Sequence, residues 1–346
     1  MAEIRRCRER DLPAVMDFIH EHWAKDHILA RNLPLMKWQH ADDDDPGLYN
    51  WMIALDEEGI QGILGFIPTS KYDRSLAIKP FTWLALWKVR TEAKNRTLGL
   101  QLMNSLTQSE SAGVVAVLGI NPKHPPMYKA LGYRTGELAQ YFVTNPDKPR
   151  TLISAPPDFD APVPRKGMAV LSRIDAAGLE RLALDPGAPA FPLKTPRYFE
   201  KRYLDHPIYT YQIYVAQLEG RPLALIAVRI AGSGPAKALR IVDFLGNEDA
   251  LAECGAAFGH LLTALDCEYA DFWQYGLSEN TMEACGFRRA PVDGDVTVPN
   301  YFEPLLRKNA RIEFAIRCEP DRRLTFFRGD GDQDRPNRAP SPEIPA

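Results

Sequence analysis

The chain has 346 residues, more than a single hydrophobic core usually serves, so we expect two domains. Its 42 Lys and Arg against 45 Asp and Glu leave a formal charge of -3, which argues against a general nucleic-acid binder or a protein that coats polyanions. Any recognition of anions must therefore be local. Five scattered cysteines without a C-x-x-C pair indicate a reducing compartment and no zinc framework: Cys7, Cys254, Cys267, Cys285 and Cys318.

Nothing in the sequence predicts a membrane protein. The charged residues 5–10 arrive without the apolar segment that follows them in a signal peptide. No apolar run approaches the roughly 18 residues that cross a bilayer. We expect a soluble, cytoplasmic protein whose partners include neither nucleic acid nor membrane.

The first elements in the chain are a strand and a helix. Residues 4–19 predict a short strand and then a helix for which Asp11 is the N-cap. The following region is rich in histidine and tryptophan, but His22 and His27 are five apart and fall on different helical faces, so we expect no metal site. Two interpretations remain, a packed amphipathic helix or a lining for a sugar or nucleotide base built from His22, Trp23, His27, Trp38 and His40.

A strand, a basic loop and a helix N-terminus follow between residues 84 and 106. Residues 84–89 read as a strand, 90–97 as a polar loop and 98–106 as a helix by their apolar spacing. The unpaired N–H groups of a first helical turn and the positive end of the helix dipole bind phosphate or pyrophosphate. Lys94 and Arg96 add cationic charge beside that turn.

A second strand, 114–120, leads through Asn121 to a helix with the sequence Tyr-Lys-Ala-Leu-Gly-Tyr at 128–133. This order resembles the acyl-CoA-binding core of the GNAT N-acetyltransferase superfamily over about the first 145 residues. Gly99, Asn121 and Tyr128 match family positions. The loop matches in part, because Lys94 stands where the family usually has Gln or Arg, and Thr97 replaces a glycine that normally lets the pyrophosphate approach closely.

The resemblance implies functional residues. Tyr128 matches the general acid that protonates the departing thiolate, and His124 is the candidate general base, although a loop histidine is more often merely exposed. The strand end would present backbone N–H groups to the thioester carbonyl and pantetheine. The residues expected to bind acyl-CoA, as acetyl-CoA or a short 3-hydroxyacyl-CoA, are Trp87, Lys88, Val89, Lys94, Asn95, Arg96, Thr97, Leu98, Gly99, Leu100 and Asn121.

A proline-rich stretch at 149–167 is the expected linker between a domain of residues 1–148 and one of residues 168–320. After it we expect a strand at 168–174, a helix from Asp175 to Leu184 and a second helix at 195–204. Alternating aromatic and β-branched residues then predict a hairpin of 209–218 and 222–230 around Glu219-Gly220.

The second half ends as the first does. A strand at 240–245, a helix at about 248–265 and a strand at 269–275 lead to Met282-Glu-Ala-Cys-Gly-Phe287, which mirrors 128–133. Met282 replaces the tyrosine, and the acidic 246–249 replaces the basic loop, where it would repel CoA. The fold class is therefore α/β (α+β), two tandem GNAT-like domains with mixed sheets flanked by helices; the second is degenerate, although a diverged active site there stays open.

The last segment, 321–346, changes character to a polar tail. Asp330, Asp332 and Asp334 have the first spacings of a calcium loop, but Arg335 and Ser341 occupy the positions that need Gly and Glu, so an EF-hand is rejected. The tail is either solvated or folds back as a ligand-binding turn. Residues 338–346 are expected to be disordered.

The whole pattern resembles GNAT-type N-acyltransferases of bacterial surface polysaccharides such as O-antigen and lipopolysaccharide. The resemblance implies an acceptor that is a nucleotide-linked amino sugar, such as a dTDP-3-amino-3,6-dideoxyhexose. Two alternatives remain: an acetyltransferase for another small-molecule or protein amine, and a non-catalytic protein that binds acyl-CoA or a nucleotide sugar. The expected acceptor contacts in the tail are Asp330, Asp332, Gln333, Arg335 and Asn337.

Overall fold

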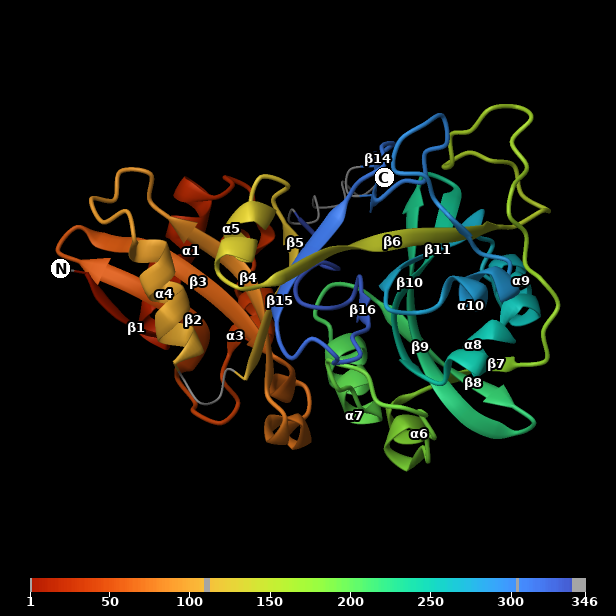
Figure 1. The fold of residues 1–346 in the computed structure, drawn as a ribbon, viewed down its shortest axis with the longest axis horizontal. Coiled ribbons are helices and arrows are strands. Elements are labelled where there is room, and N and C mark those ends of the chain that lie inside the picture. The colour runs from red at the N-terminus through yellow and green to blue at the C-terminus, as the bar shows by residue number, and fades with distance from the viewer. Residues whose placement is uncertain (1, 109–112, 303–304, 338–346) are drawn as a thin grey trace, which may run out of the picture. The chain divides into compact units, whose positions relative to one another are not determined.

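The computed structural model describes residues 2–108, 113–302 and 305–337. The described chain forms two compact units (Figure 1). The first unit contains residues of Met1–Leu118, Ile316–Cys318 and Arg335–Ala346, and the second contains Gly119–Ala315 and Glu319–Asp334.

The first unit is built on a sheet with the strand order β1-β2-β3-β4-β5. Neighbouring strands are antiparallel except β4 and β5, which are parallel. Because parallel strands need a crossover, helix α4 connects them. The strands are β1 (Glu3–Arg8), β2 (Leu48–Asp56), β3 (Gly59–Pro68), β4 (Phe81–Val89) and β5 (Val114–Ile120).

Helices α1 and α4 of the first unit begin where the sequence predicts them, whereas α2 and α3 were not predicted. α4 packs on the sheet so closely that a Cβ on Gly62 of β3 would lie 3.1 Å from a methyl of Leu102. Asp11 stands at the N-cap of α1, but its carboxylate accepts hydrogen bonds from Arg8 N and the Arg5 guanidinium and does not cap the helix. The helices are α1 (Leu12–His22), α2 (Ile28–Arg31), α3 (Leu33–His40) and α4 (Leu98–Thr107), with short turns at Glu9–Asp11, Thr69–Lys71 and Arg74–Ile78.

The second unit contains a sheet with the strand order β6-β11-β10-β9-β8-β7. Among the described residues of these strands, β10 and β11 are parallel and the other neighbouring strands are antiparallel. The predicted hairpin is confirmed as β8–β9, with Glu219 at φ 52° and Gly220 at φ 77°, the left-handed conformation that two-residue hairpin turns use. The strands are β6 (Arg134–Thr144), β7 (Val170–Ile174), β8 (Tyr211–Leu218), β9 (Arg221–Ser233), β10 (Ala236–Gly246) and β11 (Tyr269–Tyr275).

Shorter strands extend this sheet. β12 (Arg288–Arg289) pairs with β6, and β16 (Phe326–Phe327) pairs with β11. β15 (Ile312–Arg317) lies next to β6. A separate two-stranded sheet is formed by β13 (Tyr301–Phe302) and β14 (Leu305–Leu306).

Helices α8, α9 and α10 cover one face of this sheet and bury the main core of the second unit, which includes Phe258, Phe272 and Phe287 (Figure 1). The single helix predicted at 248–265 is wrong: it is divided at Glu253–Cys254, because the chain at Arg165 crosses there and leaves no room for a side chain on Gly255. The helices are α5 (Pro125–Ala130), α6 (Ala176–Arg181), α7 (Pro196–Phe199) with a π turn at Glu200–Leu204, α8 (Glu248–Ala252), α9 (Gly255–Ala264) and α10 (Glu279–Ala284).

Residues 119–148, which the sequence analysis assigned to the first domain, pack in the second unit because β6 pairs with β11. The proline-rich segment is irregular but packed, since Leu152 and Ile153 are buried and their N–H groups donate to the Glu268 carboxylate at 2.8–3.0 Å. The boundary at 149–167 therefore differs from the division of the compact units.

The expectation of a solvated tail is wrong for Phe326–Asp334. Phe326 is fully buried, and Asp330 and Asp334 are at most 1% exposed, because each acidic side chain meets a basic partner in the second unit. The tail folds back, as the alternative expected, and its role as a ligand-binding turn stays a prediction. The expected disorder of 338–346 lies outside the described residues.

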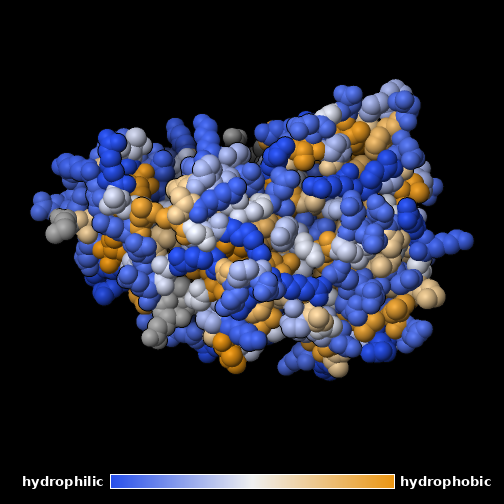
Figure 2. Space-filling model, in the orientation of Figure 1, coloured by the Kyte–Doolittle hydropathy of each residue, from blue (hydrophilic) through white to orange (hydrophobic). Residues whose placement is uncertain are grey.

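Hydrophilic residues cover most of the face drawn in Figure 2. No helix in the described part of the chain has the length and apolar character needed to cross a membrane.

Candidate active site

The parallel strands β4 and β5 separate part of the way along their length. Their pairing runs from Phe81 and Val114 to Leu84 and Val117, whereas β4 continues to Val89. Beyond Leu84, β4 remains paired with β3 along its other edge. Among the described residues, the pairing of β4 with β5 therefore ends at Leu84, where the two strands diverge. In α/β sheets, ligands bind outside the carboxyl ends of parallel strands.

A β-bulge accompanies the separation. Leu64 pairs with Trp87 and Phe66 with Leu84, so Gly65 of β3 faces two residues of β4. A bulge bends its strand and increases the local twist. Gly65 also has to be glycine, because a Cβ there would lie 2.8 Å from the ring of Trp51. The bulge therefore turns the end of β4 away from β5.

The loop from β4 to α4 is organised by Asn95. Its Oδ1 accepts hydrogen bonds from Thr97 N at 3.0 Å and Thr97 Oγ1 at 2.8 Å, and its amide nitrogen donates to Gln101 at 2.9 Å. Thr97 is the N-cap of α4, but its side chain makes no capping bond to the first turn. Leu98 N already donates to Asn95 O of the loop at 3.2 Å, so the N–H groups of the first turn that can meet a ligand are those that follow Leu98.

Charge and shape around this helix N-terminus suit an anion. Lys94 and Arg96 are exposed, and Lys94 Nζ is 3.9 Å from a Glu58 carboxylate oxygen, an exposed pair that contributes little and yields readily to a ligand. Gly99 lies against Trp87, since a Cβ there would be 3.5 Å from the indole ring. The structure thus brings together Trp87, Lys94, Asn95, Arg96, Thr97, Leu98 and Gly99 around one turn of helix.

The candidate proton-transfer residues lie in the second unit. Tyr128 is 4% exposed, and its ring meets Tyr133 edge-on at 5.5 Å. Burial raises the pKa of the Tyr128 phenol, so it keeps its proton at neutral pH, as a general acid requires. His124 and Asn121 are exposed at the start of α5, where Asn121 Oδ1 accepts a hydrogen bond from Lys123 N.

The predicted acceptor residues of the first unit divide by burial. His40 is fully buried, donates through Nδ1 to Phe66 O at 3.2 Å and accepts through Nε2 from Gln39 at 3.0 Å, and burial lowers its pKa to about 3. It therefore supports the sheet and presents no surface to a ligand, contrary to the predicted lining. His27 is 6% exposed and its Nδ1 accepts a hydrogen bond from Leu29 N, and burial with Arg335 nearby lowers its pKa to about 3.

Aromatic surface remains at the other predicted positions. Trp23 is 49% exposed, and His22, half-buried, packs its ring on Phe18 at 4.7 Å. Trp38 packs against Tyr72 at 5.7 Å. Only this part of the predicted lining is positioned to meet a ligand ring.

The tail residues also divide. Asp330 bonds to Lys194 at 2.8 Å, Asp332 is 7% exposed, and Gln333 packs against Gly119. Arg335 and Asn337 belong to the first unit, where Asn337 O accepts a hydrogen bond from Ile28 N at 3.0 Å.

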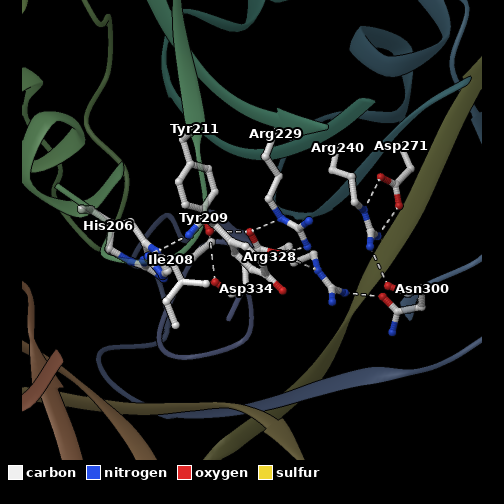
Figure 3. Close-up of polar contacts among 12 residues, drawn as sticks. His206, Ile208, Tyr209, Tyr211, Arg229, Arg240, Asp271, Asn300, Arg328 and Asp334 are labelled. Carbon is white, nitrogen blue, oxygen red and sulfur yellow. Dashed lines mark hydrogen bonds and ion pairs between the residues drawn. The ribbon is translucent and has the colours of Figure 1, made fainter. Parts of the chain in front are cut away.

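Sequence reasoning missed the buried ion network that holds the tail in the second unit (Figure 3). Asp334 accepts two hydrogen bonds from Arg229 at 2.8 and 2.9 Å and one from Tyr211 at 2.7 Å, and Arg328 lies 3.3 Å away. Arg240 forms a similar pair with Asp271 at 2.6 and 3.0 Å. A signal was present in the sequence, since Arg229, Arg240, Asp243 and Asp271 interrupt otherwise apolar strands.

A separate cavity of about 340 Å³ lies in the first unit near Ser105 and Leu106, at the end of α4 opposite Gly99. Its charged groups pair with one another, with Arg6 2.9 Å from Asp42 and Arg74 2.8 Å from Asp44. This position separates the cavity from the first turn of α4.

Three solved structures similar to the chain establish the fold. A GCN5-related N-acetyltransferase from Anabaena variabilis ATCC 29413 matches 92% of this chain and 72% of its own, with a TM-score of 0.56 and 10% identity. A probable N-acyltransferase from Enterococcus faecalis V583 matches 90% of this chain and 72% of its own, with a TM-score of 0.52 and 8% identity. A GCN5-related N-acetyltransferase from Kribbella flavida matches 91% of this chain and 71% of its own, with a TM-score of 0.50 and 13% identity.

No protein-family model matches the chain, and neither does any curated protein sequence. At these low identities the likeness concerns the fold, which is the GNAT fold expected from the order of the motifs.

Proposed function

We propose that the protein transfers an acyl group from acyl-CoA to an amine. The observation that carries this proposal is the bulged end of β4 where it leaves β5, followed by the exposed, basic loop that leads into the first turn of α4. A diverging strand edge offers backbone hydrogen bonds to pantetheine, and the helix N-terminus offers N–H groups to pyrophosphate. The first turn of α4 thus suits the pyrophosphate of CoA, and the diverging edge of β4 suits its pantetheine.

The proposed reaction assigns one task to each group. The neutral amine attacks the thioester carbonyl carbon, and the β4 backbone N–H groups stabilise the oxyanion that forms. As the C–N bond forms and the C–S bond breaks, Tyr128 donates its proton to the departing thiolate. The amine releases its proton to a base, for which His124 is the candidate, and the tyrosinate recovers a proton through solvent.

For the acceptor we propose a nucleotide-linked amino sugar, such as a dTDP-3-amino-3,6-dideoxyhexose. Its support is the sequence resemblance together with the half-exposed Trp23, because an indole face stacks on bases and sugar rings. Another small-molecule or protein amine is the second candidate, and a non-catalytic binding protein is the third.

A thiol-release assay with mass detection of the product tests the proposal. Acetyl-CoA and a short 3-hydroxyacyl-CoA are each mixed with a nucleotide amino sugar, a polyamine or a lysine peptide. Thiol release that matches N-acyl product supports acyl transfer, and the acceptor with the highest kcat/KM defines the substrate class. Binding of acyl-CoA without thiol release for any amine would favour the non-catalytic alternative, and turnover with the peptide or polyamine alone would overturn the amino-sugar assignment.

A further inference from the structure

The second unit repeats the plan of the first around its parallel strands. β10 and β11 are joined through α8 and α9 as β4 and β5 are joined through α4. The helices that follow the two parallel pairs, α5 after β5 and α10 after β11, both lie in the second unit and end in the same way. Gly132 and Gly286 have φ of 79° and 91°, and the next residue donates a hydrogen bond of 3.0 Å in each case, Tyr133 N to Tyr128 O and Phe287 N to Met282 O.

The parallel strands of the second unit separate at the corresponding place. β10 and β11 pair from Ala238 and Tyr269 to Ile241 and Phe272, whereas the strands continue to Gly246 and Tyr275. The register of β10 on β9 shifts between Ile241 and Asp243, so Val242 is an extra residue, as in the β4 bulge. The second unit therefore has the same diverging edge that we propose for pantetheine in the first.

That diverging edge is occupied by the chain itself. Phe326 and Phe327 of β16 pair antiparallel with Tyr275 and Gln274 of β11, and Gly329 N donates to Val242 O of β10 at 2.6 Å. The segment Phe326–Asp334, called here the C-terminal segment, thus bonds to both strands after they part. Its occupation is close, because a Cβ on Gly329 would lie 2.3 Å from the Tyr203 hydroxyl.

Apolar packing fills the same space. The ring of Phe327 stacks on Phe272 of β11 at 5.5 Å and meets Phe244 of β10 edge-on at 6.2 Å. A cavity of about 90 Å³ remains at the carboxyl end of β10, lined in part by Lys194, Phe244 and Gly246. Ligand pockets typically have volumes of about 300–1,000 Å³, so this remainder is too small for pantetheine.

Buried ion pairs hold the C-terminal segment at two points. Lys194 Nζ lies 2.6 Å from Asp243 of β10 and 2.8 Å from Asp330 of the segment, and these side chains are at most 3% exposed. Asp334 is held by Arg229 and Arg328 (Figure 3). Charges buried in pairs are costly to separate, because each partner left behind is a buried, uncompensated charge.

The N-terminus of α8, which follows β10, is also unfavourable for binding a phosphate. Asn247 Oδ1 accepts a hydrogen bond from Asp249 N, so this first turn is capped. Glu248 and Asp249 place negative charge in that turn, where it repels another anion. The second unit thus lacks the open edge and the anion-binding turn at the two places where the first unit offers them.

We infer that the C-terminal segment is the permanent internal occupant of the second unit's acyl-CoA position, so that the chain binds one acyl-CoA, in its first unit. The one-site statement rests on the proposed function. The occupation of the second unit does not, and it is tested separately. The second sheet then acts as the anchor from which the chain continues at Arg335 into the first unit.

Binding stoichiometry tests the one-site statement on the full chain. Native mass spectrometry with acetyl-CoA should show one ligand per chain, and Lys94→Glu with Arg96→Glu should remove it. A matched pair of exposed arginines in the second unit, Arg173→Glu with Arg181→Glu, should leave it unchanged. Two ligands per chain, or one ligand that survives the Lys94 and Arg96 changes, would overturn the inference.

Hydrogen exchange tests the occupation directly. Amides of peptides covering 326–334 should exchange slowly in the free protein and equally slowly with saturating acetyl-CoA, because the segment is not displaced. Exchange at the rate of an unstructured peptide, or a clear acceleration by acetyl-CoA, would overturn the permanent occupation. If acetyl-CoA does not bind at all, the proposed function fails, and slow exchange of 326–334 still decides whether the segment fills the second sheet.

Discussion

Asp334 offers a sharp test of the ion network in the second unit. Its carboxylate is 1% exposed and holds Arg229 with two hydrogen bonds, with Arg328 and Tyr211 also in contact. Asp334→Asn keeps the shape and removes the charge, which leaves two buried guanidinium groups without their counter-ion. Breaking such a pair typically costs about 3–5 kcal/mol. At about 2–4 °C per kcal/mol, the melting temperature should fall by about 6–20 °C.

Urea unfolding followed by tryptophan fluorescence measures the change, because Trp273 is buried in the second unit. Asp321→Asn is the matched control, since Asp321 is an exposed carboxylate in the same part of the chain. A loss below about 0.5 kcal/mol for Asp334→Asn, the size of an ordinary surface change, would refute the reasoning.

The free energy of unfolding of wild type and of Asp334→Asn should depend differently on pH. Burial alone would raise the pKa of Asp334, but Arg229 and Arg328 outweigh it and hold that pKa well below its usual range. A carboxylate whose folded pKa is lowered stabilises the protein above its unfolded pKa of about 3.9 and loses this contribution as the pH falls through the folded value. The gap between wild type and Asp334→Asn should therefore be full at pH 7 and narrow below about pH 4.

Three further predictions concern the first unit and the proton donor. Lys94→Glu with Arg96→Glu should weaken acetyl-CoA binding more than about tenfold in calorimetry, because charge-assisted contacts to phosphate are lost and repulsion replaces them. Tyr128→Phe should lower kcat by about 10²-fold or more with little change in acetyl-CoA affinity, the usual scale for a general acid. Burial lowers the pKa of His27 and His40 to about 3, so unfolding takes up protons below their unfolded pKa of about 6.5, and the first unit should lose up to about 1.4 kcal/mol per histidine per pH unit between about pH 6 and 4.

Matched variants separate these effects from general disruption. Arg173→Glu with Arg181→Glu should leave acetyl-CoA affinity unchanged, and full affinity in the Lys94 and Arg96 variant would move the anion site elsewhere. Tyr133→Phe removes a neighbouring phenol and should keep most of kcat, whereas wild-type kcat in Tyr128→Phe would reject the acid assignment. His260→Gln replaces an exposed histidine of the second unit and serves as the control. A first-unit stability that is flat from pH 7 to 4 would contradict burial of the two neutral histidines.

Local patterns predicted most of the regular elements. The strands at 114–120 and 269–275 have the bounds expected from their apolar runs, and Glu219-Gly220 forms the turn expected from its residues. These features depend on neighbours in the sequence. The division of the helix at 248–265 depends on the crossing of the chain at Arg165, about 90 residues away, so no local pattern contains it.

The candidate site shows the same distinction. The loop with Lys94 and the helix turn with Gly99 follow from residue types, but the bulge at Gly65 depends on which residues of β3 and β4 pair, and the register is a property of the sheet. His40 looked like a lining residue because its sequence neighbours are polar or aromatic. Its burial comes from Phe66 and Trp51 on strands that the helix covers.

The sequence left the polar tail open between a solvated run and one that folds back, and the reason is physical. A single Asp is almost never buried without a partner, so a run with Asp330, Asp332 and Asp334 reads as solvated. The partners Lys194 and Arg229 lie more than 100 residues earlier, in segments that are not obviously related to the tail. The charged residues within the apolar strands, such as Arg229 and Asp243, were the part of this pairing that the sequence made recognisable.

The two diverging strand pairs differ in what completes them, and this difference has a measurable consequence. In the second unit the chain itself supplies the hydrogen bonds and the apolar cover, so that sheet is complete in the free protein. In the first unit we propose that acyl-CoA supplies them.

A ligand that binds only the folded state stabilises it by RT ln(1 + [L]/Kd), about 2.7 kcal/mol when the ligand is at 100 times Kd. Acetyl-CoA should therefore slow hydrogen exchange at 85–100 by up to about 100-fold and leave β10 and β11 unchanged. Equal protection of both sheets would mean that the ligand acts on the whole chain, and protection of β10 and β11 alone would place the ligand in the second unit, against both proposals.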